Sequence, residues 1–167
     1  MIILVLGGAR SGKSALAERL AGDGPSDEIV YVATSPVADA DMVERVAAHR
    51  TRRPPSWATV ECGPDLDLVA CAAALNPSAT LVVESLTAWV AGAAAFSVDV
   101  AGLCEALCAR PGLSIVVSDE VGMGVHPSSE AGRRFRDGLG SANQAVAAVA
   151  GEVLLVVAGR MLRLDRA

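Results

Sequence analysis

Residues 7–14 read Gly7-Gly8-Ala9-Arg10-Ser11-Gly12-Lys13-Ser14, directly after the apolar run 2–6 and directly before a helical pattern. The spacing is that of a phosphate-binding loop, in which glycines let main-chain N–H groups curve around a phosphate. In such a loop the lysine reaches the outer phosphates and the serine hydroxyl can bind Mg²⁺. The helix that begins near Gly12 points its positive N-terminal end at the same place. The segment therefore predicts a triphosphate site, with Lys13 as a candidate catalytic residue and Ser14 as a candidate metal ligand.

The composition fits a single globular domain over residues 1–167. Hydrophobic residues make up 52% of the chain and aromatic residues only 3%, which is typical of a sheet covered by helices. The net charge of −5 argues against nucleic acid or anionic lipid as a partner. The longest uncharged apolar stretch, 86–96, is about half of the ~20 residues that a membrane span needs. We therefore expect a cytoplasmic enzyme without a membrane span.

Short apolar or β-branched runs alternate with helical patterns along the whole chain. Strands are expected at 2–6, 29–33, 57–61, 80–84, 113–118 and 152–158, with an edge strand at 161–164. Helices are expected from the phosphate loop to residue 22, and at 39–50, 66–75, 85–96, 98–109 and 129–149. The alternation predicts an α/β, three-layer domain of the P-loop NTPase type, with a mostly parallel sheet and helices on both faces.

Hydroxyl and acidic side chains follow several of the expected strands. Thr34 and Ser35 come where a parallel sheet would deliver them beside the phosphate loop, although a Ser-Pro turn explains each hydroxyl equally well. Glu84 ends an apolar strand, like the acid that holds the metal in phosphate-loop proteins. Asp119 and Glu120 follow another buried strand and compete with Glu84 for that role.

His49 falls on the apolar face of the expected helix 39–50 and precedes the densest positive run of the chain, Arg50-Thr51-Arg52-Arg53. Spacing alone favours an ordinary half-buried histidine and a solvated helix end, where arginines suit the negative helix pole.

Several segments in the same order resemble one protein family closely. They are the loop 7–14, the strand end 31–35, the pattern H-R-x-x-R-P-x-x-W-x-T-x-E at 49–61, the loop at 118–127, and the segments 134–144 and 152–159. The family is the bifunctional adenosylcobinamide kinase/adenosylcobinamide-phosphate guanylyltransferase of cobalamin biosynthesis. The resemblance covers nearly the whole chain.

The resemblance implies a two-step enzyme. Adenosylcobinamide is first phosphorylated by a nucleoside triphosphate, ATP or GTP. GMP is then transferred from GTP to adenosylcobinamide phosphate, giving adenosylcobinamide-GDP and pyrophosphate. In this family the transfer passes through a GMP-histidine intermediate, and the matching position here is His49. Family members are described as trimers, so the resemblance also implies a homo-oligomer.

The same match assigns the nucleotide contacts. The residues implied are Gly7, Gly8, Ala9, Arg10, Ser11, Gly12, Lys13 and Ser14, then Ala33, Thr34 and Ser35, then Arg50, Thr51, Arg52 and Arg53, and finally Glu61 and Glu84, with Glu84 also implied for Mg²⁺. Two competing hypotheses are a monofunctional P-loop small-molecule kinase in which His49 only binds phosphate, and a nucleotide-binding module without chemistry. The segment 49–61 favours the transferase, because a simple switch has no need of it.

Overall fold

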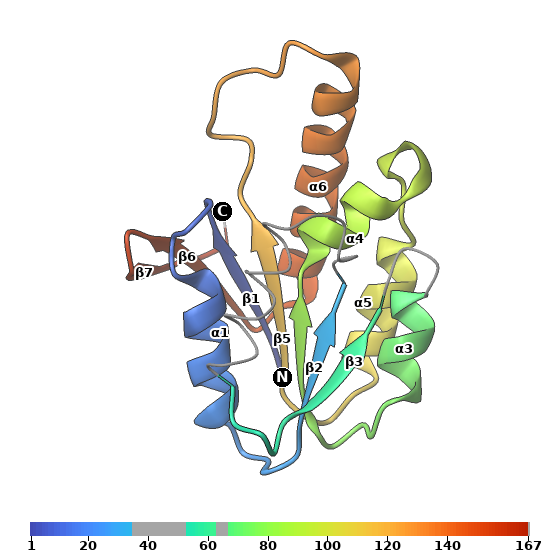
Figure 1. Ribbon diagram of the computed structural model, residues 1–167, viewed down its shortest axis with the longest axis vertical. Helices are drawn as coiled ribbons and strands as arrows, with labels where there is room; N and C mark the ends of the chain where they lie inside the picture. The colour runs from blue at the N-terminus through green and yellow to red at the C-terminus, as the bar shows by residue number, and fades with distance from the viewer. Residues whose placement is uncertain (35–52, 63–66, 167) are drawn as a thin grey trace.

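The computed structural model describes residues 1–34, 53–62 and 67–166, and it contains one seven-stranded sheet (Figure 1). The strands are β1 (Ile2–Gly7), β2 (Ile29–Ala33), β3 (Ala58–Glu61), β4 (Thr80–Glu84), β5 (Ser114–Asp119), β6 (Glu152–Val157) and β7 (Arg160–Arg163). Their order is β3-β2-β4-β5-β1-β6-β7, and β7 runs antiparallel to β6 while the other pairings are parallel. The expected α/β class and the mostly parallel sheet are confirmed.

The helices cover both faces of this sheet. They are α1 (Lys13–Gly22), α3 (Leu68–Ala74), α4 (Leu86–Gly92), the short 3₁₀ helix η1 (Ala94–Phe96), α5 (Val100–Cys108) and α6 (Glu130–Val149). One core contains Leu16 and Ala17 of α1 with Ile3 and Val5 of β1. The other core packs α3, α4, α5 and α6 against the opposite side chains of the same strands. The two cores make the protein a three-layer structure.

The central strands are mostly apolar on both faces, because both faces are buried. In β1 the side chains of Ile3 and Val5 point to the α1 layer, and those of Ile2 and Leu4 point to the other layer. This arrangement explains why these strands read as continuous apolar runs rather than alternating ones. The parallel pairing of β1 and β4 with β5 brings the carboxyl ends of these three strands to one edge of the sheet.

Two helices start later than their apolar patterns predict, because an aspartate caps each. Asp67 Oδ1 accepts from the N–H of Val69 at 2.9 Å, and Asp99 Oδ1 accepts from the N–H of Gly102 at 2.9 Å. These caps satisfy N–H groups that the first helical turn leaves open. The helix expected at 39–50 lies outside the described residues.

The helix expected at 85–96 was too long. It ends at Gly92, and η1 follows with Ala95 and Phe96 in the left-handed region (φ 56° and 59°). The turn places the Phe96 ring edge-on against Phe135 of α6, with centroids 5.7 Å apart. An alanine-rich pattern does not reveal such a stop, because alanine favours helix and the break is fixed by a tertiary contact.

Arg110 ties the amino-terminal edge of the sheet to α3. It is only 6% exposed, and its guanidinium donates to the carbonyl oxygens of Ala72, Leu75, Asn76 and Ala79 at 3.2, 3.4, 2.9 and 3.0 Å. Burial lowers the pKa of Arg110 from its ordinary value. The charge is compensated by carbonyl dipoles, so this arginine has a structural role.

Within the described ranges, none of the helices is both long enough and apolar enough to span a bilayer.

Candidate active site

The phosphate loop turns tightly between β1 and α1, and this turn requires glycine at two positions. A Cβ on Gly7 would lie 2.5 Å from Ser11 Oγ and 2.7 Å from the carbonyl oxygen of Val156. Gly12 has a φ of 100° and caps α1 without a side-chain hydrogen bond. The N-terminal end of α1 therefore presents its positive pole at the loop, as anion binding needs.

Lys13 is held by a carboxylate at the end of the neighbouring strand β5. Its Nζ lies 2.6 Å from Asp119 Oδ1 and donates to the carbonyl oxygen of Gly8 at 3.3 Å. The main chain of Asp119 is itself fixed, since its N–H donates to Thr87 Oγ1 at 2.8 Å and its carbonyl oxygen accepts from Asn143 Nδ2 at 3.0 Å. Asp119 thus positions the ammonium group over the loop.

Ser14 and Glu84 meet at the end of β4. Ser14 Oγ donates to Glu84 Oε1 at 2.8 Å. A hydroxyl and a carboxylate are the oxygen ligands that Mg²⁺ takes in nucleotide sites, where the phosphates and water complete its shell. The donor set fits Mg²⁺. No cluster of His, Cys, Asp and Glu large enough to be a protein-only metal site occurs in the described part of the chain.

The two acids that compete with Glu84 have other partners. Asp119 binds Lys13, and Glu120 accepts main-chain hydrogen bonds from Gly122 at 2.8 Å and Met123 at 3.1 Å. Of the three, Glu84 alone is hydrogen-bonded to the loop serine. The arrangement favours Glu84 as the metal ligand.

Ala33 and Thr34 lie beside Glu84, because β2 pairs with β4 and places Ala33 opposite Glu84. The Thr34 hydroxyl donates to the carbonyl oxygen of Ser85 and accepts from the N–H of Ser85, both at 2.6 Å. The Thr34 hydroxyl therefore links the ends of β2 and β4 in this structure. Its contact with nucleotide stays a prediction.

Arg53 lies beside the second half of α1 and not at the phosphate loop, whereas Glu61 lies at the carboxyl edge of the sheet, in register with Ala33 and Glu84. The Arg53 guanidinium carbon is 3.7 Å from the centroid of the Tyr31 ring, and Nη1 donates to Thr59 Oγ1 at 3.2 Å. Arg53 also lines a hollow with Trp57 and the second half of α1. Glu61 is exposed at the end of the edge strand β3. The candidates Ser35, His49, Arg50, Thr51 and Arg52 lie outside the described residues.

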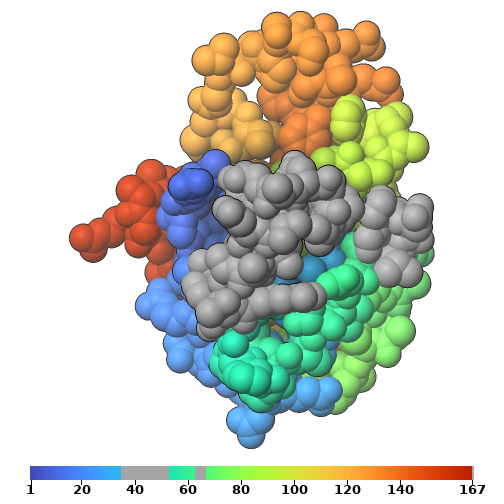
Figure 2. Space-filling view, viewed as in Figure 1, coloured from blue at the N-terminus to red at the C-terminus, as the bar shows by residue number. Residues whose placement is uncertain are grey.

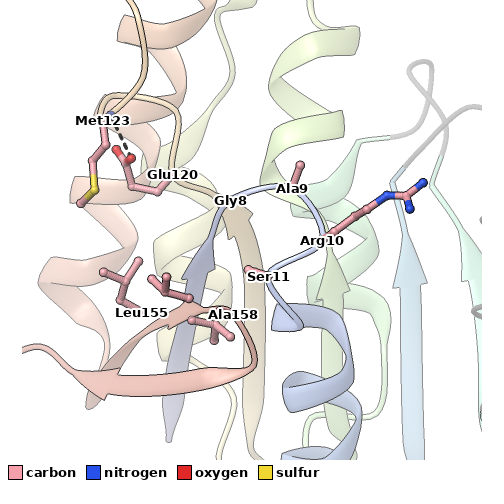
Figure 3. A pocket seen from close by; sticks show the side chains of 10 residues that line it. Gly8, Ala9, Arg10, Ser11, Glu120, Met123, Leu155 and Ala158 are labelled. Carbon is pink, nitrogen blue, oxygen red and sulfur yellow. Dashed lines mark hydrogen bonds between the residues drawn. The ribbon is translucent and has the colours of Figure 1, made fainter.

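A pocket of about 390 Å³ opens on the β6 side of the phosphate loop (Figure 3). Its walls are residues 8–11 of the loop, Glu120 and Met123 after β5, and residues 155–158 at the end of β6. The loop at 118–127 and the segment 152–159 both belong to the family resemblance, but the sequence does not indicate that residues 155–158 line the site. Only the position of β6 beside β1 brings them there.

Comparison with known proteins agrees with this geometry. Residues 3–164 match the family model described as cobinamide kinase / cobinamide phosphate guanyltransferase. The chain belongs to this family. The bifunctional adenosylcobalamin biosynthesis protein CobU of Escherichia coli (strain K12) is 39% identical over 178 residues, covering 95% of this chain and 97% of the relative. The corresponding protein CobP of Pseudomonas aeruginosa is 40% identical over 166 residues, covering 93% of this chain and 92% of the relative. The family resemblance found in the sequence is confirmed.

Two solved structures share the fold at 13% sequence identity. An ATPase from the type III secretion system of pathogenic bacteria has a TM-score of 0.59 and covers 92% of this chain, which spans 50% of that ATPase. The flagellar accessory protein FlaH of Methanocaldococcus jannaschii has a TM-score of 0.54, with 96% of this chain and 74% of FlaH covered. At this identity the likeness concerns the fold alone, and it confirms the P-loop NTPase type of this family member.

Proposed function

We propose that this chain phosphorylates adenosylcobinamide with ATP or GTP and then transfers GMP from GTP to adenosylcobinamide phosphate. The observation that carries the proposal is the meeting of Ser14 and Glu84 at 2.8 Å beside Lys13, in a chain of the cobinamide kinase family. We also expect a cytoplasmic homo-oligomer.

In the kinase step, the substrate hydroxyl attacks the γ-phosphorus, a new P–O bond forms, and the nucleoside diphosphate leaves. Loop N–H groups, the N-terminus of α1 and Lys13 stabilise the negative charge that spreads over the phosphate oxygens. Ser14 and Glu84 would hold Mg²⁺, which supplies further positive charge when it is bound. The contribution of the chain is mostly positioning and electrostatic stabilisation.

In the transferase step, we assign the nucleophile to His49. Its ring nitrogen attacks the α-phosphorus of GTP, a P–N bond forms, and pyrophosphate leaves. A phosphate oxygen of adenosylcobinamide phosphate then attacks the same phosphorus, so that a P–O bond forms and the P–N bond breaks. A neutral imidazole is a good nucleophile near pH 7, and a covalent intermediate divides one difficult displacement into two. Arg50 and Arg52 would supply charge along the triphosphate.

The test uses GTP labelled in either the α- or the γ-phosphate, incubated with the protein and Mg²⁺. We expect acid-labile, alkali-stable α-label on the wild type. The chain contains only 2 histidines, so His126→Ala is a matched control for His49→Ala. Label should persist on His126→Ala and be lost on His49→Ala.

The same variants distinguish the kinase activity from the guanylyltransferase activity. Lys13→Ala should lose both, because both reactions need the phosphates held on the loop. A folded His49→Ala protein should keep the kinase activity. Absence of α-label on the wild type would contradict the transferase and leave the monofunctional kinase. Loss of kinase turnover in His49→Ala would contradict separate roles for the two steps.

A further inference from the structure

The two sides of the phosphate loop differ. The candidate metal ligands lie on the side of β4, and open space lies on the side of β6. Ser14, Glu84 and Asp119 gather where β4 and β5 end, whereas the pocket of about 390 Å³ lies between the loop and the end of β6. Figure 2 shows the C-terminal strands standing beside the N-terminal segment on the left of this face. The sheet order therefore gives the loop two different flanks.

The pocket wall is attached directly to the phosphate loop. The N–H of Gly159 donates to the carbonyl oxygen of Ser11 at 2.8 Å, and a Cβ on Gly12 would lie 3.5 Å from the Cα of Gly159. Gly159 has a φ of 73°, which glycine adopts readily. Because the turn after β6 touches the loop main chain, a group in the pocket would sit at a fixed distance from phosphates on the loop.

The chemistry of the pocket is aliphatic. Leu155, Val156, Val157 and Ala158 form one wall, and Met123 lies on the opposite side (Figure 3). Met123 is 79% exposed and Val157 is 57% exposed, although both stand next to a polar loop. Exposed apolar side chains that border a concave site indicate an apolar ligand group.

The charged residues of the lining do not change this character. Both carboxylate oxygens of Glu120 accept main-chain N–H groups of its own loop, at 2.8 and 3.1 Å. Glu120 thereby fixes the segment that carries Met123. The Arg10 side chain extends away from Leu155 and Met123 (Figure 3). The pocket therefore offers mainly van der Waals contact to a ligand, and its side chains offer few hydrogen-bonding groups.

A ligand with a phosphate chain at one end and a group that offers apolar contact surface at the other fits this combination. The volume is at the small end of the ~300–1,000 Å³ range of ligand pockets, which suits a nucleoside and not a corrin ring with its side chains. We propose that the pocket binds the base of the nucleoside triphosphate that donates phosphate in the kinase step, with Met123 and the end of β6 as its apolar contacts. This inference rests on the proposed function for the identity of the step.

Two substitutions change the pocket from opposite walls. Val157→Trp fills it from β6, and Met123→Ala removes the side chain from its mouth. Leu162→Trp and Val125→Ala are matched controls, because Leu162 and Val125 are exposed apolar residues that do not line the pocket. Circular dichroism and thermal unfolding would verify that each variant folds.

The measurement is calorimetric binding of ATP and of tripolyphosphate, each with Mg²⁺ and without corrinoid. Tripolyphosphate carries the same phosphate chain without a nucleoside. Val157→Trp should weaken ATP binding about tenfold, because the indole occupies space that the base needs. Met123→Ala should weaken it about threefold, because apolar contact area is lost. Tripolyphosphate binding should change less than about twofold in both variants, and the controls should bind both probes like the wild type.

Three results would overturn the proposal. Equal weakening of ATP and tripolyphosphate would mean that these residues only support the loop. Unchanged ATP binding would place the base elsewhere. A raised KM for adenosylcobinamide with unchanged ATP binding would assign the pocket to the corrinoid. A wild-type protein that binds ATP but phosphorylates no cobinamide would contradict the proposed function while the binding comparison still tests the pocket.

Discussion

Asp119→Asn should make the protein bind GTP more tightly. Asp119 Oδ1 lies 2.6 Å from Lys13 Nζ, and the two side chains are 27% and 12% exposed. A triphosphate must take Lys13 from this carboxylate and must approach its negative charge. The substitution leaves the bonds to Thr87 and Asn143 intact, because they involve the N–H and carbonyl groups of residue 119. The local structure should therefore survive.

The size of the effect follows from the exposure of the pair. A partly buried ion pair of this kind contributes more than the ~0–1 kcal/mol of a surface pair and less than a fully desolvated one. We take about 1.4 kcal/mol, which corresponds to about tenfold in the dissociation constant. Asp137→Asn is the matched control. It removes the same charge from a carboxylate that is 67% exposed and 2.9 Å from Arg136 on α6.

Titration calorimetry with GTP, at fixed ionic strength with and without Mg²⁺, checks the prediction. Asp119→Asn should tighten binding in both conditions, and Asp137→Asn should have little effect. Weaker binding without Mg²⁺ would refute the reasoning, because it would mean that Asp119 helps to bind phosphate. Weakening confined to the Mg²⁺ condition would instead make Asp119 the metal ligand in place of Glu84.

Two further predictions concern stability. Arg110→Met should lower the free energy of unfolding by about 3–5 kcal/mol, because four carbonyl groups lose a buried donor. Arg166→Met is the control, because it removes only an exposed hydrogen bond to the Ala148 carbonyl oxygen. Urea unfolding compares the two variants, and equal losses of stability would contradict the structural role of Arg110. Burial, the largest cause, raises the pKa of Cys62 from 9.0 to about 11, so the unfolded chain loses this proton first and stability should fall between pH 9 and 11. Urea unfolding across that range should show a smaller fall in Cys62→Ala, and an identical pH dependence would contradict the raised pKa.

Local patterns in the sequence were sufficient for most of the architecture. The loop 7–14 and the apolar runs around it predict β1, the turn and α1, because each depends on residues close in the chain. Strands β2 and β4 were predicted with the bounds that the structure shows. Several other strands differ from their predicted bounds by one residue, and the larger differences are at helix ends, where an aspartate cap or the contact between Phe96 and Phe135 decides the boundary.

The segment 49–61 shows a different limit. Its pattern supports the family assignment, which the family model and the curated relatives confirm. The role of His49 stays a prediction, because the residue lies outside the described part of the structure. Arg53, which belongs to the same pattern, lies against Tyr31 and not at the loop.

The sequence by itself determined that this protein has a phosphate loop in a parallel α/β sheet and belongs to a bifunctional kinase and transferase family. Only the tertiary structure decided the partners of the two acids. Glu84 and Asp119 both end apolar strands, and nothing in their local sequence tells which one reaches Ser14 and which one reaches Lys13. The order β4-β5-β1-β6 decides it and also creates the pocket beside β6. Strand order and register depend on contacts between distant segments, so local periodicity cannot supply them.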